Sequence, residues 1–136
     1  MTELKLLIND TTPSGKIRLG VYTDSNGSPG SLLLDAGEVN AANGWIGIKN
    51  LNLAVTANSF YWLTFLPQNW NEIQYQGSGQ PADCHVYTAQ TYGPLPSIIK
   101  AGGSNSTPFV MLASVSTSSS TAIFGLNAGN STGGTS

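Results

Sequence analysis

The chain has 136 residues, the length of a single domain that can bury a core without a disulfide or a metal. Charged residues make up only 9% of it and the formal net charge is -2, so no basic stripe is available to neutralise phosphates, which argues against nucleic acid as a partner. The apolar runs are too short for membrane insertion, and the single cysteine, Cys84, excludes an internal disulfide and a thiolate zinc site.

The first predicted elements are two strands joined by a turn. Apolar and polar residues alternate over 16–21, which places three apolar side chains on one face of a half-buried strand. Residues 24–30 follow with an Asn-Gly pair and a Pro-Gly pair, both of which favour turns, and the apolar pattern resumes over 32–34. We predict a β-hairpin with a long turn at 24–30.

Further strands follow along the chain. Residues 45–49 alternate after an Asn-Gly turn, apolar residues alternate again over 51–55, and residues 59–66 carry aromatic side chains on both faces, which is typical of a central strand. We also predict strands near 71–76, 84–89 and 109–115. Helical spacing is lacking, and Gly and Pro interrupt nearly every candidate helix. The pattern predicts an all-β fold, an antiparallel β-sandwich that is jelly-roll-like and has almost no helix.

The last part of the chain differs in composition. We assign residues 1–115 to a β-sandwich module and residues 116–136 to a tail rich in Ser, Thr and Gly. Within the tail, residues 121–126 return briefly to apolar character. Two interpretations stay open: the tail is a disordered end, or residues 121–126 form an edge or first strand that completes a sandwich in its own chain or in a neighbour.

Three segments carry a resemblance to a known family: residues 17–33, the Asn-Gly-Trp triplet that ends at Trp45, and residues 59–63. They resemble tandem, jelly-roll-like β-sandwich modules of secreted bacterial and archaeal proteins, which are appended to polysaccharide-active enzymes and surface proteins. The resemblance implies a carbohydrate-binding-module-like protein that is extracellular or lies at the cell surface. Its motifs are mostly turn and core residues, so they identify a fold better than a ligand.

The end of the chain departs from the family pattern. Such modules usually begin with a strand that contains Phe-Gly, whereas this chain has Phe124-Gly125 near its end. A register cut from a repeat array would give this arrangement, with the final segment being the first strand of the next unit. Because an unpaired sheet edge is a template for strand addition, neighbouring copies of the same module are predicted as partners alongside a glycan.

The sequence shows no recognisable catalytic constellation. Hydrolysis of a glycoside needs two carboxyl groups about 5 to 10 Å apart across a cleft, whereas nearly all acidic residues here flank turns, where solvated or turn-capping carboxylates are expected. The seven acidic residues are Glu3, Asp10, Asp24, Asp35, Glu38, Glu72 and Asp83. His85 can share a strand face with Asp83, but the sequence places no nucleophile beside them. We therefore expect no enzyme, and we assign His85 a structural or merely exposed position.

Calcium is the one cofactor that the sequence leaves open. Asp24 and Asn26 offer oxygen ligands in a tight turn, and calcium prefers such hard donors. Both residue types are equally expected there because their side chains hydrogen-bond the turn backbone. We expect no cofactor, with a structural calcium at this turn as the alternative.

Aromatic residues give the best indication of a binding site. Trp and Tyr rings stack on the apolar C–H faces of sugars, while neutral amides bind the hydroxyl groups. Trp45 and Trp62 lie in predicted strands and are assigned to the core. Trp70 lies in a predicted loop among amides, so we predict it as the central contact, the alternative being that it caps the sandwich. The complete predicted ligand-binding set is Trp70, Tyr75, Tyr92, Gln68, Asn71 and Gln74.

The leading functional prediction is a non-catalytic carbohydrate-binding module of an extracellular multimodular protein, which binds a polysaccharide or glycan through an aromatic and amide surface. The alternative is a structural or adhesive surface repeat that self-associates by strand exchange. An enzyme ranks third.

Overall fold

The structure is a computed structural model that describes residues 1–76 and 84–116. Within these ranges the chain forms strands and no helix, so no helix there could cross a membrane. The strands are β1 (Glu3–Ile8), β2 (Lys16–Ser25), β3 (Ser28–Asn40), β4 (Gly44–Ile48), β5 (Tyr61–Pro67), β6 (His85–Tyr87), β7 (Gly103–Asn105) and β8 (Met111–Ser114). The predicted all-β class is confirmed. The predicted strand at 121–126 lies outside the described residues.

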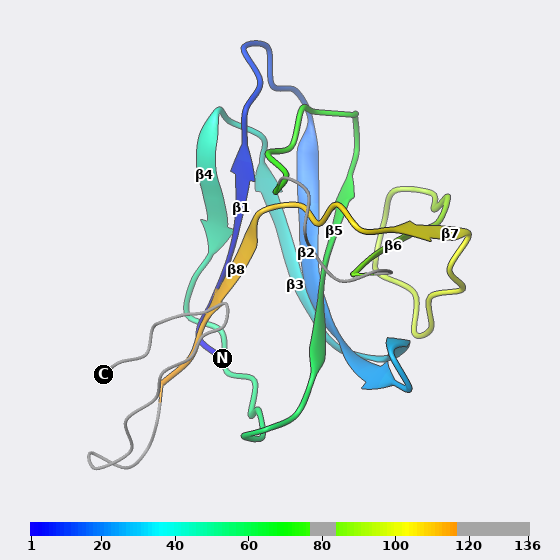
Figure 1. Ribbon diagram of the computed structural model, residues 1–136. Coiled ribbons are helices and arrows are strands. Elements are labelled where there is room, and N and C mark those ends of the chain that lie inside the picture. Colours follow the sequence, from blue (N-terminus) through cyan, green and yellow to red (C-terminus); the bar gives the residue numbers. More distant parts are fainter. Residues whose placement is uncertain (77–83, 117–136) are drawn as a thin grey trace.

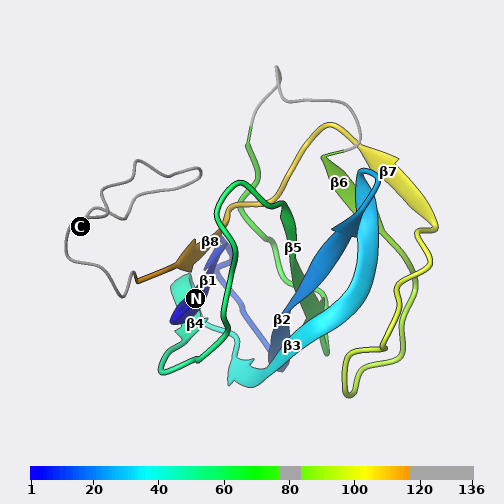
Figure 2. The same cartoon turned by 90° about the horizontal axis from the view of Figure 1, so that it is seen from below.

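The described strands form two three-stranded sheets and a small ribbon (Figure 1). One sheet has the order β4-β1-β8 and the other β3-β2-β5, and every named pair of neighbours is antiparallel. Figure 2 separates the two groups, with β4, β1 and β8 together on one side and β5, β2 and β3 on the other. The antiparallel β6-β7 ribbon lies beside β5.

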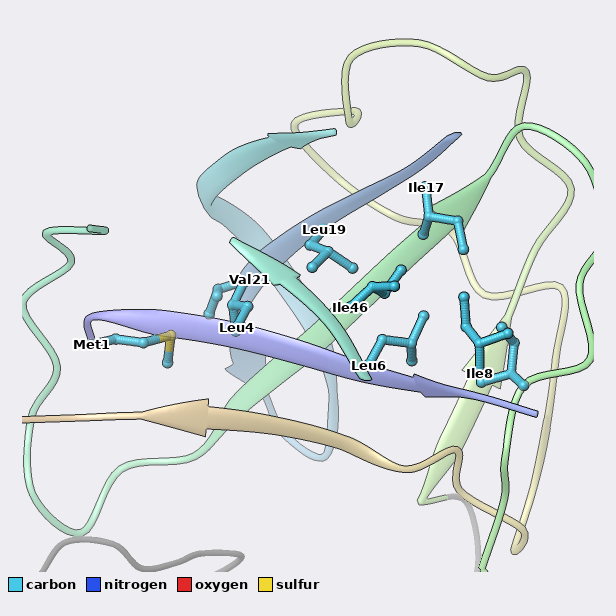
Figure 3. Close-up of a cluster of buried hydrophobic side chains, with 9 residues drawn as sticks. Met1, Leu4, Leu6, Ile8, Ile17, Leu19, Val21 and Ile46 are labelled. Carbon is cyan, nitrogen blue, oxygen red and sulfur yellow. The ribbon is translucent and has the colours of Figure 1, made fainter. Parts of the chain in front are cut away.

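Side chains of both three-stranded sheets meet in one hydrophobic cluster (Figure 3). Because successive side chains of a strand point to opposite faces, β1 and β2 each direct three apolar residues to the same interior. These six residues are Leu4, Leu6 and Ile8 of β1 and Ile17, Leu19 and Val21 of β2, each at most 1% exposed. Full burial stabilises each side chain by about 1.5–3 kcal/mol. The two central strands therefore hold the sheets together, while the jelly-roll-like topology stays a prediction.

The turn between β2 and β3 is shorter than predicted. Asn26 and Gly27 alone connect the strands, with φ of 52° and 85°, and Ser25 already pairs with Ser28. Positive φ at both positions suits a two-residue turn that matches the twist of the strands, and Asn-Gly favours that conformation. The predicted long turn at 24–30 is therefore wrong, because Pro29 pairs with Asp24 inside the ladder.

Strand β5 lies at the edge of its sheet, and the prediction of a central strand at 59–66 is wrong. The central position belongs to β2, which pairs with β3 on one side and β5 on the other. The alternation of residues 51–55 produces no strand, although Leu51, Leu53 and Val55 still pack against the core. Aromatic content thus did not distinguish a central strand from an edge strand.

The outer face of β2 is covered by residues 92–98, which we call the latch loop. Tyr22 is fully buried beneath this loop, and its hydroxyl donates a hydrogen bond to the Pro96 carbonyl at 2.6 Å. Gly20 leaves the space that the Leu95 side chain fills, since a Cβ at that position would overlap Leu95. Strand β2 is consequently covered on both faces.

Two carboxylates of β3 hold the latch loop. Asp35 accepts a hydrogen bond from the Leu95 N–H at 2.9 Å and pairs with Arg18 at 3.0 Å, while Glu38 accepts one from the Tyr92 hydroxyl at 2.6 Å. Partial burial acts to raise the pKa of Asp35, but the hydrogen bonds from Leu95, Arg18 and the backbone outweigh it and hold the pKa below its ordinary value. Desolvation, together with the bond to Glu38, raises the pKa of Tyr92 to about 12.

Candidate functional site

A cleft with a volume of about 400 Å³ opens along β5. Its walls come from β5, from residues 84–90 around β6, from the latch loop and Ile99, and from residues 108–111 at the start of β8, with Trp70 at its margin. Apart from the single histidine, His85, the described residues that line it carry no ionisable acid or base of the Asp, Glu, Lys or Arg type. The cleft is therefore suited to a neutral ligand.

Five of the rings that line the cleft form an aromatic cluster. Phe109 lies at its centre, with ring centroids 5.1 Å from Phe65, 6.3 Å from Trp70 and 4.8 Å from His85, and His85 lies 5.7 Å from Tyr87. Edge-to-face pairs at such distances each contribute about 0.5–1.5 kcal/mol beyond burial. Trp70 is 62% exposed and Tyr87 is 53% exposed. These two rings are the exposed members of the cluster, and they pack against the half-buried Phe109 and His85.

Trp70 owes its position to the loop that follows β5. The Gln68 N–H donates to the Lys16 carbonyl at 2.8 Å, which continues the β2–β5 edge into the loop. On the other side of Trp70, the Asn71 side chain accepts from the Ser14 N–H at 2.9 Å and donates to the Ser14 carbonyl at 3.0 Å. Hydrogen bonds thus fix the loop on both sides of the exposed Trp70 ring.

Asn71 itself is not available to a ligand. It is fully buried, and its amide also donates to the Asn69 carbonyl at 2.9 Å. A buried amide must find partners inside the protein, and Asn71 has three. Its predicted role as a ligand contact is replaced by a structural role.

The other predicted amides are also engaged in the protein. Gln68 accepts a hydrogen bond from the Lys16 N–H at 3.2 Å. Gln74 accepts one from Asn9 at 3.3 Å and donates to the Tyr75 carbonyl at 3.1 Å. Tyr75 is 58% exposed and its backbone forms an isolated bridge with Phe109, yet its side chain does not line the cleft.

Tyr92 belongs to the latch loop and not to the cleft. Its hydroxyl donates to Glu38, which explains its position, and desolvation together with this bond raises its pKa. Of the six predicted contacts, Trp70 alone lines the cleft in the part of the chain that the structure describes.

Sequence reasoning did not assign Tyr87, His85 and Phe109 to the ligand site. His85 and Tyr87 are two residues apart on β6, so their side chains share a face, which is a signal that the alternation rule could have provided. Phe109 joins them only through tertiary packing. Thr88 and Gln90 add polar groups to the same wall.

Trp45 and Trp62 differ from their assignment to the core. Trp45 is 48% exposed on the opposite sheet, where the Lys5 ammonium lies 5.3 Å from its ring centroid. Trp62 lines the cleft and is only partly buried, with its indole N–H donating to Asp24 at 2.8 Å.

The turn residues proposed as calcium ligands have structural partners. Besides Trp62, Asp24 accepts a hydrogen bond from the Gly27 N–H at 3.2 Å, and Asn26 supplies the positive φ of the turn. No group of three or more His, Cys, Asp or Glu side chains placed to hold a metal is found within residues 1–76 and 84–116. Asp83, the predicted neighbour of His85, lies outside the described residues. Calcium binding at the turn stays a prediction.

No protein-family model matches the chain, and no match is found among curated proteins or among solved structures. The resemblance to tandem carbohydrate-associated modules therefore stays a prediction.

Proposed function

We propose that the protein is a non-catalytic carbohydrate-binding module that holds a neutral polysaccharide in the cleft beside β5. The single observation that carries this proposal is the pair of exposed rings, Trp70 and Tyr87, at an apolar cleft whose described lining lacks acidic and basic side chains other than His85. The module would act in an extracellular or cell-surface protein.

The chemistry of the cleft agrees with a sugar polymer. A pyranose ring offers an apolar C–H face that gains by stacking on Trp70 or Tyr87, because these rigid amphipathic rings bury area at little cost in side-chain entropy. Its hydroxyl groups find neutral partners in Thr88 and Gln90 of the same wall. A charged ligand would instead have to shed its hydration without a compensating charge.

The test compares two exposed tryptophans. Affinity electrophoresis and titration calorimetry against a panel of soluble neutral polysaccharides should detect binding by the unmodified protein. Trp70→Ala should weaken that binding at least tenfold, corresponding to the roughly 1.4 kcal/mol that one stacked ring would supply. Trp45→Ala is the matched control, since Trp45 is similarly exposed but lies on the other sheet.

Tyr87→Ala should also weaken binding, whereas Tyr75→Ala should not, because Tyr75 is similarly exposed but does not line the cleft. Absence of binding to every polysaccharide, or equal affinities of Trp70→Ala and the unmodified protein, would refute the proposal.

A second candidate is a structural or adhesive surface repeat that self-associates by strand exchange. One observation favours it: in the described part, β5 and β8 each pair with a strand on one side only. Light scattering over a range of protein concentrations tests it, and a monomer at every concentration would exclude it.

A further inference from the structure

A second pocket lies where β5 begins, beside the turn of the β2–β3 hairpin, and we call it the hairpin pocket. Its volume is about 420 Å³, and its lining residues are Asp24, Gly27, Phe60, Tyr61, Trp62 and Cys84. The hairpin pocket adjoins the cleft, because Tyr61, Trp62 and Cys84 line both. Asp24, Gly27 and Phe60, however, do not line the cleft.

Asp24 brings an uncompensated negative charge to the hairpin pocket. The residue is half-buried, and one carboxylate oxygen accepts a hydrogen bond from the Trp62 indole N–H at 2.8 Å, the other from the Gly27 N–H at 3.2 Å. These bonds fix the position of the carboxylate, but both donors are uncharged. None of the ion pairs within residues 1–76 and 84–116 includes Asp24. A cation in the pocket would therefore compensate this charge.

Two aromatic side chains share the pocket with this carboxylate. Tyr22 pairs with Trp62 in the ladder and Asp24 follows Tyr22 by two positions, so alternation directs Asp24 and Trp62 to the same face of the sheet. Phe60 precedes Trp62 by two positions, also lines the pocket and is 80% exposed. Tyr61 instead packs against the core. The pocket thus combines one carboxylate with a largely exposed ring and a half-buried ring.

This combination suits a cation that has no N–H groups. The face of an aromatic ring attracts a cation that lies within about 6 Å of the ring centroid. A primary ammonium would require acceptors for its N–H groups, whereas the Asp24 carboxylate already accepts two hydrogen bonds. A quaternary ammonium requires no acceptor, and its methyl groups would bury apolar area against Phe60 and Trp62.

Calcium, the cation that the turn sequence leaves open, suits the hairpin pocket less well. Calcium takes about 6–8 oxygen ligands. Asp24 is the one acidic side chain among the described residues that line the pocket, and Trp62 offers an N–H group and no oxygen. The aromatic rings would therefore leave much of the coordination shell of a calcium ion without ligands.

We propose that the hairpin pocket binds a small organic cation with a quaternary ammonium group, with Asp24 supplying the negative charge and Phe60 and Trp62 the aromatic contacts. The inference goes beyond the proposed function and does not rest on it, because Asp24 and Phe60 do not line the cleft. A free cation and a lipid headgroup share this chemistry, and separate arms of the test distinguish these two sources.

A nuclear magnetic resonance titration of the full chain with choline tests the site. The Trp62 indole N–H donates to Asp24, so its signal reports on the pocket. Choline should shift this signal saturably, with a Kd in the millimolar range. The neutral analogue, in which a tert-butyl group replaces the trimethylammonium group, should bind at least about fivefold more weakly. Equal affinities of the two compounds, or no saturable shift with choline, would overturn the proposal, as would displacement of choline by calcium at equal concentration.

Two variants test the residues that carry the proposal. Asp24→Asn removes the charge, keeps an oxygen that can accept from Trp62, and should weaken choline binding about tenfold. Glu3→Gln is the matched control, since it changes the net charge equally but lies on the other sheet.

Phe60→Ala should weaken choline binding about threefold, and because Phe60 is 80% exposed, this variant decides even if Asp24→Asn does not fold. An unchanged affinity in either Asp24→Asn or Phe60→Ala, or an equal loss in Glu3→Gln, would contradict the proposal.

Vesicles of phosphatidylcholine distinguish the two sources of the ammonium group. Choline binding without sedimentation of the protein with vesicles would support a free cation. Sedimentation that both excess choline and Asp24→Asn abolish would support a lipid headgroup in the same pocket. None of these probes is a polysaccharide and neither substituted pocket residue lines the cleft, so failure of these tests would leave the proposed function standing.

Discussion

Strands β2 and β5 are neighbours in one sheet, yet β2 is covered on both faces whereas β5 borders the cleft. The core covers one face of β2 and the latch loop covers the other, so that even the large Tyr22 is fully buried. Along β5 every residue is half-buried and borders the cleft. The difference teaches that covering loops, more than the aromatic content of a strand, decide which strand of this sheet borders a cleft.

The largest expected effect on stability comes from a substitution in β2, the strand that is covered on both faces. Leu19→Ala removes a fully buried side chain and should lower the free energy of unfolding by about 2–5 kcal/mol, measured by chemical denaturation. Phe60→Ala, next to β5, is the matched control because Phe60 is 80% exposed, and it should change stability by less than about 0.5 kcal/mol. Similar losses in both variants would remove the distinction between the two strands.

Gly20→Ala tests whether the packing of the latch loop against β2 requires a residue without a side chain at position 20. The new Cβ would overlap Leu95 and lie 2.7 Å from the Leu34 carbonyl oxygen, so the loop or β3 must shift. We expect a loss of about 1–3 kcal/mol, the usual range for overpacking. Hydrogen exchange should show faster exchange of the Leu95 amide, and an unchanged rate at that amide together with unchanged stability would show that the loop is not seated as described.

Tyr22→Phe removes one bond of the latch and keeps the ring. The Pro96 carbonyl would lose its 2.6 Å partner, so stability should fall by about 0.5–1.5 kcal/mol in denaturant unfolding. Tyr61→Phe provides a comparison on the open strand, where the hydroxyl accepts a bond from the exposed Thr56 N–H and should matter less. The reverse order of effects would contradict the comparison.

Acid should give the smallest effect, through the two latch-loop carboxylates and through Asp10, whose pKa is also held below its ordinary value by hydrogen bonds from the Glu72 and Thr12 backbone. The pKa values of Asp35 and Glu38 are lower in the folded protein than their ordinary values, the latter chiefly because of the Tyr92 hydroxyl. Their stabilisation is therefore complete above the unfolded pKa values near about 4 and is lost as the pH falls through the folded ones. Unfolding measured between pH 6 and pH 3 should show this decline, and Asp35→Asn should reduce it, with Glu38 and Asp10 retaining their share. A decline of the same size in Asp35→Asn would assign it to other groups.

Local patterns predicted much of the fold. The β2–β3 hairpin followed from alternation and an Asn-Gly pair, although the turn proved shorter because that pair alone reverses the chain. Strand β1 was missed, even though Leu4, Leu6 and Ile8 alternate with less buried residues. The strand order could not be predicted, because it depends on pairings such as that of β1 with β8 from the far end of the described chain.

The candidate site was predictable at one residue. Trp70 was identified because amides surround it in a predicted loop. The same pattern wrongly assigned Asn71 to the ligand site, because a buried amide and an exposed amide cannot be distinguished in the sequence. Tyr92 was misassigned because its partner, Glu38, lies 54 residues away. Contacts between distant segments, such as Trp70 with Phe109, become visible only in three dimensions.

The three tryptophans occupy three different surroundings: Trp45 lies under a lysine ammonium, Trp62 is tied to Asp24 through its indole nitrogen, and Trp70 faces the solvent at the cleft. Indole fluorescence depends on the polarity around the ring, so the protein carries a built-in optical reporter of cleft occupancy. With Trp45 and Trp62 replaced by phenylalanine, a molecule that lies over Trp70 would move the emission of the remaining indole to shorter wavelength, without any attached dye.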